Sequence, residues 1–333
     1  IGGSAGAGTV IVDNSSVLAT WGGNLYVGNG SSGALTLTNN SAANIDGGAG
    51  EIHLGSASAA GAITIGTGGG TLLASVVRFD NVGSSLTLDH GLGSYNFNAD
   101  LSGNGQLIVE SGTTSLYGDA AAFTGETHIN GGALLLQGVD LGSAVDVDGG
   151  LLGGRGSVTG AISVRSGSIL APGSDAAIGQ LSSNDDVTFY SGSTFEVHVD
   201  NAGNGDRLGS GSSIYLDNGV TLNVLAQNGR DDGSTYNPST TYTILDSRAG
   251  LSGTFDTVNE NFAYLDANVT YDAYSAYLTL TRCVSCGTFA SLANTPNQSA
   301  VAGAIESQGS GTLYNAILAL PVGEPGAAFE QLS

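Results

Sequence analysis

Short triplets that alternate apolar and polar residues recur along most of the chain. Residues 25–38 read LYVGNGSSGALTLT and residues 52–65 read IHLGSASAAGAITI, so each segment holds a triplet, a Gly/Ser/Ala stretch and a second triplet. The first triplets are offset by 27 residues and the second by 28. Further triplets lie at 86–88, 107–109, 134–136, 145–147 and 162–164. This alternation predicts short strands, and the intervals rich in Gly, Asn, Ser and Asp predict turns.

Many short strands at even spacing fit three architectures, which are a sandwich, a propeller and a β-solenoid. Helical periodicity is absent from residues 1–282. Triplets this short bury little apolar surface alone, whereas stacked coils join their inward side chains into one core. The spacing also drifts, and it is shorter than the roughly 40 residues of a propeller blade. We therefore predict an all-β fold, a parallel β-helix, with its stalk over residues 1–184.

The strands lengthen and aromatic residues gather after residue 185. Large aromatic side chains indicate a better-packed end. The last coil of a solenoid also needs a cover, because its open edge would otherwise pair with other chains. We predict a β capping module over residues 185–282, and the side chains expected to form its folding core are Tyr242, Phe255, Phe262, Tyr264, Tyr271 and Tyr277.

Strand alternation ends near Arg282, and helical patterns follow in residues 283–333. Helices are expected at 300–305, 313–318 and 327–332. Asn294 or Thr295 is placed to cap the first helix, and Pro321 ends the second. The last predicted unit is therefore a short helical linker over residues 283–333.

Composition and charge exclude several classes of function. The 333 residues include 55 glycines, and the net charge is 7 − 29 = −22 with no lysine. Such a chain is unsuited to reading phosphates, which excludes nucleic acid, and to binding anionic lipid. A mean hydropathy of +0.13 argues against disorder. The chain begins at Ile1 and shows no signal peptide, so we expect it to be cut from a longer protein.

The two cysteines, Cys283 and Cys286, form a C-x-x-C pair. A zinc site would need a second ligand pair, and the four histidines at 53, 90, 128 and 198 are scattered. A redox site of the thioredoxin type would need a βαβ context, which is missing. The remaining alternatives are a small-loop disulfide and two free thiols. We expect the histidines to point outward from strands, and Trp21 to lie in the core or at a cap.

Catalytic and metal signatures are sparse. The segment GGAGEIHL at 47–54 resembles a calcium-binding nonapeptide, but Glu replaces Asp and the unit does not recur in tandem. The acidic pairs at 146/148, 185–186 and 231–232 are read as solvated turns, with weak calcium binding as the alternative. No G-x-S-x-G motif stands in a strand-to-helix context, and the arginines are spread singly. We expect no catalytic residue, no metal and no cofactor within these residues.

Several motifs, taken in chain order, resemble one family. FTGETHINGGAL at 123–134, DGGLLGGRGSV at 148–158 and SILAPG at 168–173 resemble the passenger repeat of bacterial type V autotransporters. Residues 187–199, then YTIL at 242–245 and GTFD at 253–256, resemble the autochaperone region of that family. TPNQSAVA at 295–302 and AAFEQLS at 327–333 resemble the junction before its membrane barrel.

The resemblance implies a right-handed β-helical passenger domain, exported to the cell surface or released through its own outer-membrane barrel. It implies that residues 185–282 assist folding during secretion. The leading interpretation is a stalk for adhesion, as in a virulence adhesin, or for self-association. The partners would be the barrel and a host-cell surface, a glycan or another copy. The alternatives are a non-catalytic scaffold for an enzyme domain N-terminal to Ile1, and a β-helix that binds polysaccharide.

Overall fold

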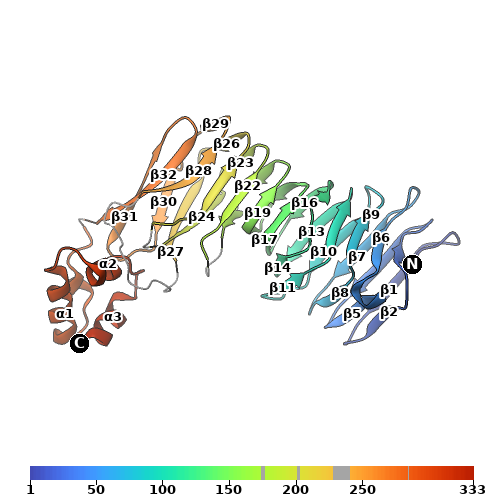
Figure 1. Ribbon diagram of the computed structural model, residues 1–333, viewed down its shortest axis with the longest axis horizontal. Helices are drawn as coiled ribbons and strands as arrows, with labels where there is room; N and C mark the ends of the chain where they lie inside the picture. Colours follow the sequence, from blue (N-terminus) through green and yellow to red (C-terminus); the bar gives the residue numbers. More distant parts are fainter. Residues whose placement is uncertain (174–176, 201–202, 228–240, 284) are drawn as a thin grey trace.

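The computed structural model is an elongated stack of β-coils with a group of helices at its C-terminal end (Figure 1). It describes residues 1–333 except 174–176, 201–202, 228–240 and 284. The acidic pair at 231–232 and the arginine at 230 lie outside the described residues. Strands two or three positions apart in chain order pair in parallel along the stack, so each coil contributes one strand to each face. The predicted all-β solenoid is confirmed.

One face of the solenoid runs the length of the stack as an 11-stranded sheet. All of its neighbours pair in parallel, and the sheet crosses residue 184 without interruption. Its strands are β1 (Gly8–Val12), β4 (Gly33–Leu37), β7 (Gly61–Ile65), β10 (Ser85–Asp89), β13 (Gln106–Ser111), β16 (Glu126–Ile129), β18 (Ala144–Val147), β20 (Ile162–Val164), β23 (Val187–Phe189), β26 (Ser213–Leu216) and β29 (Gly250–Ser252).

The N-terminal coils have two further faces. A three-stranded sheet contains β2 (Val17–Thr20), β5 (Ser41–Ile45) and β8 (Gly70–Leu73). A five-stranded sheet contains β3 (Leu25–Val27), β6 (Glu51–Leu54), β9 (Val76–Phe79), β12 (Asp100–Gly103) and β15 (Ala122–Phe123). The offsets read from the sequence match the registers, because Leu25 pairs with Ile52 and Leu35 pairs with Ile63.

A 13-stranded sheet forms the second face of the C-terminal coils. Its strands are β11 (Tyr95–Phe97), β14 (Thr113–Leu116), β17 (Ala133–Leu141), β19 (Leu151–Val158), β21 (Ile169–Pro172), β22 (Gln180–Ser183), β24 (Thr194–Val199), β25 (Arg207–Ser210), β27 (Thr221–Ala226), β28 (Thr241–Ser247), β30 (Thr257–Glu260), β31 (Leu265–Tyr271) and β32 (Ser275–Arg282). After β19 the sheet divides into two branches, one through β21 and one through β22.

The division depends on two long strands that turn a corner without breaking. In β17 the register shifts between Gln137 and Val139, around Gly138 at φ +80°. In β19 the corner is at Gly154, whose φ is +89° and where a Cβ would come within 2.2 Å of the Leu136 carbonyl oxygen. Only glycine fits such a position without strain. The two halves of each strand therefore belong to different faces of the coil.

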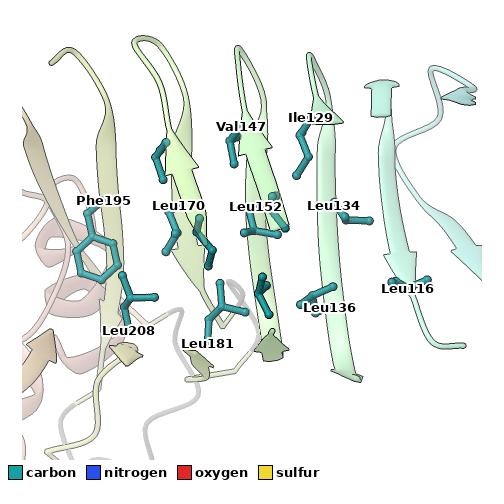
Figure 2. Close-up of a cluster of buried hydrophobic side chains, with 14 of the residues drawn as sticks. Leu116, Ile129, Leu134, Leu136, Val147, Leu152, Leu170, Leu181, Phe195 and Leu208 are labelled. Atoms are coloured by element: carbon teal, nitrogen blue, oxygen red, sulfur yellow. The ribbon is translucent and has the colours of Figure 1, made fainter. Parts of the chain in front are cut away.

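The core is a set of continuous rows of aliphatic side chains that run along the stack. Figure 2 shows Leu134, Leu152, Leu170 and Phe195 aligned on successive strands, and all four are fully buried. Each inward triplet residue thus rests on the residue one coil away. Stacked coils remove from water a surface that a single coil would leave exposed.

The helices gather after the last strand. They are α1 (Pro296–Glu306), α2 (Thr312–Leu318) and α3 (Pro325–Leu332). Two short 3₁₀ turns are also present: η1 (Asp46–Gly48) lies between β5 and β6, and η2 (Phe289–Leu292) lies between β32 and α1. Thr295 caps α1 by accepting a bond from the backbone N–H of Gln298, at 3.2 Å. Among the described residues, none of the helices has the length and apolar character needed to cross a membrane.

Trp21 lies in neither the core nor a cap contact, and that expectation is wrong. Its side chain is 93% exposed in the turn between β2 and β3. The turn is held by its backbone, since the N–H of Gly22 donates to a carboxylate oxygen of Asp46 at 3.0 Å. Side chains at such corners point away from the coil axis, so the apolar character of Trp21 does not bring it inward.

Candidate functional site

The C-terminal end of the solenoid is closed by a unit in which the strand direction reverses. We call residues 241–333, other than residue 284, the closing unit. Its strand β32 pairs antiparallel with β28 on one side and with β31 on the other. A parallel coil can extend only by adding another parallel strand, and the β31–β32 hairpin occupies that edge instead. An occupied edge is protected from pairing with another chain.

The six aromatic residues predicted for the folding core all lie in the closing unit. Tyr242, Phe255, Phe262 and Tyr264 are buried, whereas Tyr271 and Tyr277 are half-buried. They form more than one cluster. The ring of Phe255 lies between Phe195 of β24, at 6.1 Å between centroids, and Tyr271, at 6.4 Å. The role of these residues in folding stays a prediction.

Polar atoms of these tyrosines bind the backbone around them. The hydroxyl of Tyr264 donates to the Phe289 carbonyl at 3.1 Å, and burial raises the pKa of Tyr264 to about 12. The Tyr271 hydroxyl accepts from the N–H of Phe255 at 3.0 Å, and burial raises its pKa as well. The Tyr277 hydroxyl donates to Asp272 in the β31–β32 turn, at 2.9 Å. Each hydroxyl therefore joins two segments of the closing unit.

The sequence analysis missed the side chain that connects strands to helices, Arg282. Its guanidinium carbon lies 5.1 Å from the ring centroid of Tyr264 and 5.2 Å from that of Phe289. Its nitrogens donate to Glu306 Oε1 of α1 at 3.2 Å and to the Gly287 carbonyl at 2.8 Å. Glu306 Oε2 in turn accepts from the N–H of Phe289 at 2.7 Å. Arg282 and Glu306 thus link β32, η2 and α1.

The helices fold back onto the strands through a second contact. The N–H of Ala263 donates to the Leu320 carbonyl at 2.9 Å, and the N–H of Val322 donates to the Asn261 carbonyl at 2.7 Å. Phe329 of α3, together with Ile305 and Leu318, is buried against the same core. The helices α1, α2 and α3 pack as a folded group, and the role of residues 283–333 as a linker stays a prediction.

Cys283 and Cys286 are joined in a disulfide, with their Cα atoms 5.5 Å apart. The carboxylate of Asp266 lies close to both sulfurs. Only thiolates ligate metals well, so disulfide sulfurs beside a single carboxylate do not make a metal site. The pair instead closes a short loop between β32 and η2.

Two of the four histidines contradict the expectation that they point outward. His90 and His198 are buried, at 1% and 5% exposure. His90 Nδ1 accepts from the N–H of Leu92 at 3.0 Å, and Nε2 lies 2.9 Å from Thr114 Oγ1. Burial lowers the pKa of His90. An imidazole that accepts at Nδ1 donates from Nε2 when neutral, so it is not positioned to take a proton from Thr114.

The other buried histidine pairs with a buried acid. His198 Nδ1 lies 3.1 Å from Asp206 Oδ2, and the N–H of Gly179 donates to Asp206 Oδ1 at 2.7 Å. Burial raises the pKa of Asp206, against the lowering effect of these donors. An acid–imidazole pair of this kind is one part of the arrangement that activates a serine. A sequence search for local motifs does not find it, because eight residues and a turn separate the two side chains.

Comparison with known proteins adds one relative. A 216-residue stretch, 62% of this chain, is 31% identical to a protein named "Extracellular serine protease" from Serratia marcescens. The chain spans 20% of the length of that relative. No protein-family model matches the chain. The similarity connects this parallel solenoid with a protein that is named extracellular.

The comparison contradicts one expectation, that the chain is not an enzyme within these residues. The relative is named a serine protease. The sequence argument relied on the lack of a local G-x-S-x-G signature. Serine protease triads are assembled from residues far apart in the chain and are recognised by geometry, so a missing local motif does not exclude them.

Proposed function

We propose that the chain is the β-helical passenger segment of a secreted protein with serine protease activity. The similarity to the extracellular serine protease supports secretion and the protease assignment. The parallel stack of coils supports a stalk that holds active parts away from the cell. Under this proposal the segment is exported through an outer-membrane barrel of the same protein, as the resemblance in residues 295–333 implies.

The closing unit would provide the folding template for the rest of the stalk. The observation that carries this proposal is the way in which the C-terminal end is covered. The antiparallel β31–β32 hairpin covers the edge of β28, and the helices pack against the same core. Coils can therefore add to a formed C-terminal end one at a time, toward the N-terminus.

A pair of matched leucine variants tests the template. Leu278 of β32 and Leu54 of β6 are both fully buried in strands. Refolding of the whole chain from urea would be followed by circular dichroism for Leu278→Ala and Leu54→Ala. We expect Leu278→Ala to slow formation of the entire solenoid, and Leu54→Ala to loosen only nearby coils. Equal effects on the refolding rate, or a larger effect of Leu54→Ala, would remove the template role.

The protease assignment is tested separately on the complete secreted protein. Casein hydrolysis is measured in the culture medium with and without a sulfonyl fluoride, which sulfonylates active serines with release of fluoride. We expect hydrolysis that the reagent abolishes. A secreted, folded protein that leaves casein intact would refute protease activity while leaving the stalk proposal standing.

Adhesion or self-association is a second candidate function, favoured by exposed apolar side chains in the N-terminal coils. Ile11, Val17 and Trp21 expose 68%, 62% and 93% of their surface there. Isolated exposed apolar residues are common, but three within the coil that contains β1 and β2 favour contact with another chain. Sedimentation velocity would compare the chain with Trp21→Ser and with Tyr117→Ser, an exposed control away from that coil. Association that Trp21→Ser leaves unchanged would count against this candidate.

A further inference from the structure

A polar groove of about 520 Å³ lies on the outer side of the second branch of the 13-stranded sheet. It spans β22, β25 and β28, and the residues used in the argument below are Gln180, Ser182, Asn184, Gly209, Asp246 and Arg248. We propose that this groove is a binding site for an acidic glycan, a sugar chain that carries carboxylate groups. The proposal is independent of the protease assignment and of the template role.

The groove owes its depth to a glycine in the middle of a row of side chains. Ser182 pairs with Gly209, and Gly209 pairs with Asp246, so these three residues lie on adjacent strands. A Cβ at Gly209 would have its nearest neighbours at 3.7 and 3.8 Å, which is ordinary contact distance. The space above Gly209 is therefore open and is not required for backbone packing.

The lining of the groove selects for a ligand rich in hydroxyl groups. It consists of glycines and of hydroxyl, amide, carboxylate and guanidinium side chains, and the described residues contribute no apolar side chain to it. Sites for drug-like molecules are mostly apolar, and extended peptides need pockets for alternate side chains. A sugar chain needs closely spaced donors and acceptors, which Gln180, Asn184 and Asp246 supply.

The cations near the groove point to a negative charge on that ligand. Among the six arginines in the described residues, Arg78, Arg165, Arg207 and Arg282 form ion pairs. The remaining two, Arg155 and Arg248, are exposed and have no ion pair within the part of the chain that the structure describes. Arg248 lines the groove, and Arg155 lies on the neighbouring strand β19, next to the lining residue Gln180. A planar guanidinium without a partner suits a carboxylate.

The position of Arg155 follows from the register. Gly156 pairs with Leu181, so Arg155 lies beside Gln180, and Gln180 pairs with Arg207. The stem of Arg155 lies over Gly179, where a Cβ would come within 2.5 Å of its Cγ. Strands are about 4.8 Å apart, which puts Arg155 and Arg207 about 10 Å from each other along the groove. Asp246 forms an ion pair with Arg207, and this pair links the row of Ser182, Gly209 and Asp246 to the row of Arg155, Gln180 and Arg207.

The charge of the whole chain decides between classes of anionic ligand. A net charge of −22 repels a polymer with a charge on every unit at close spacing, such as a nucleic acid or polyglutamate. A glycan with widely spaced carboxylates meets less repulsion and offers hydroxyls to the rest of the groove. An acidic glycan is therefore the ligand class that fits both the local cations and the overall charge.

Calorimetric titration of the whole chain tests the site. The probes are a hyaluronate oligosaccharide, which carries one carboxylate on every second sugar, and its fully methyl-esterified form, which has the same backbone without charge. We expect the acid to bind at one site and the ester to bind at least tenfold more weakly. Arg248→Gln and Gly209→Gln should each weaken binding of the acid at least tenfold. Arg165→Gln, which removes a cation paired with Asp146 away from the groove, should leave it unchanged.

Each contrary result overturns the proposal. No heat of binding for the acid, equal binding of acid and ester, or unchanged binding in Arg248→Gln would each refute an acidic-glycan site. Tighter binding of polyglutamate than of the hyaluronate, lost in the same variants, would assign the groove to an acidic peptide. If circular dichroism shows that Gly209→Gln does not fold, the test relies on Arg248→Gln and Arg155→Gln, which change exposed side chains.

Discussion

Removing the guanidinium of Arg282 should detach the helices from the end of the solenoid. Arg282→Met retains the length of the side chain and its apolar stem, and it removes the charge and the donors. The lost interactions are the contacts with the rings of Tyr264 and Phe289 and the bonds to Glu306, to the Gly287 carbonyl and to the Tyr264 carbonyl. The perturbation therefore acts on a side chain that joins β32 to η2 and α1.

The magnitude follows from the environment of the group. A cation over an aromatic ring contributes about 0.5–1 kcal/mol when exposed and about 2 when desolvated. The side chains of Arg282 and Glu306 are 23% and 26% exposed, so their ion pair is only partly screened by solvent. Such a pair contributes on the order of 1 kcal/mol. Because these interactions are not additive, we expect a total loss of about 3 kcal/mol in the docking of the helices.

Hydrogen exchange measures this loss locally. A change of about 3 kcal/mol corresponds to roughly 100-fold faster exchange for the amides of α1, since about 1.4 kcal/mol is a factor of ten. The amides of β10, far along the stack, should keep their rates. Arg78→Met is the control, because Arg78 is paired with Asp80 but its side chain is 55% exposed.

Two results of the exchange measurement in α1 would refute the reasoning. If Arg282→Met accelerates exchange in α1 less than threefold, the packing of Phe329 and its neighbours holds the helices without the arginine. If Arg78→Met accelerates exchange in α1 as much as Arg282→Met, the effect is general and does not depend on this contact.

Three further predictions concern the coils. Leu152→Ala, in the buried row of Figure 2, should lower the free energy of unfolding by about 2–5 kcal/mol in urea titrations, and a loss below about 1 kcal/mol would contradict continuous packing. Gly154→Ala should destabilise the chain by at least about 1 kcal/mol, because φ is +89° and the Leu136 carbonyl blocks the Cβ; an unchanged urea midpoint would contradict the corner. Burial lowers the pKa of His90, so the unfolded chain binds the proton more readily and stability should fall as the pH drops below about 6.5. His90→Gln should flatten that fall in thermal melts between pH 7 and 5, and an unaltered pH profile would show that other groups cause it.

The stacking of coils could be predicted because burial inside the coils produces the alternation of apolar and polar residues in the sequence. Most side chains that point into a coil are apolar, and the residue one coil away occupies the same place. The offset of 27 residues between LYV and IHL is therefore the register of β3 with β6. The helices after residue 295 were also found, because Thr295 and the prolines mark their ends.

The corners and the closing contacts could not be read in the same way. The run LLGGRGSV looks like a strand followed by a turn, yet it forms one strand, β19, that bends at Gly154. Glycine permits both outcomes, and only pairing with Val139 and Leu181 on the neighbouring strands selects one. Likewise, nothing local marks Arg282, since its partners Tyr264 and Glu306 lie 18 and 24 residues away.

The residues of the proposed glycan site could not be grouped from the sequence either. Arg155, Gln180 and Arg207 are spread singly along the sequence, and the register alone brings them into one row. Counting charges in the sequence gives a strongly acidic chain. Only the fold reveals where the two arginines without ion pairs among the described residues lie: Arg248 lines the groove, and Arg155 is next to its lining residue Gln180.

The parallel stacking also determines how the molecule would respond to a pulling force. The hydrogen bonds between coils run along the long axis of the stack, so tension between its ends loads them one coil after another rather than all together. The coil from Leu25 to Ile52 takes up 27 residues and that from Leu107 to Thr127 takes up 20. Each coil that opens therefore releases about 65–95 Å of chain, more than ten times the spacing of about 4.8 Å that it occupied. Anchored at one end and pulled at the other, such a stalk would lengthen in steps and dissipate sudden loads.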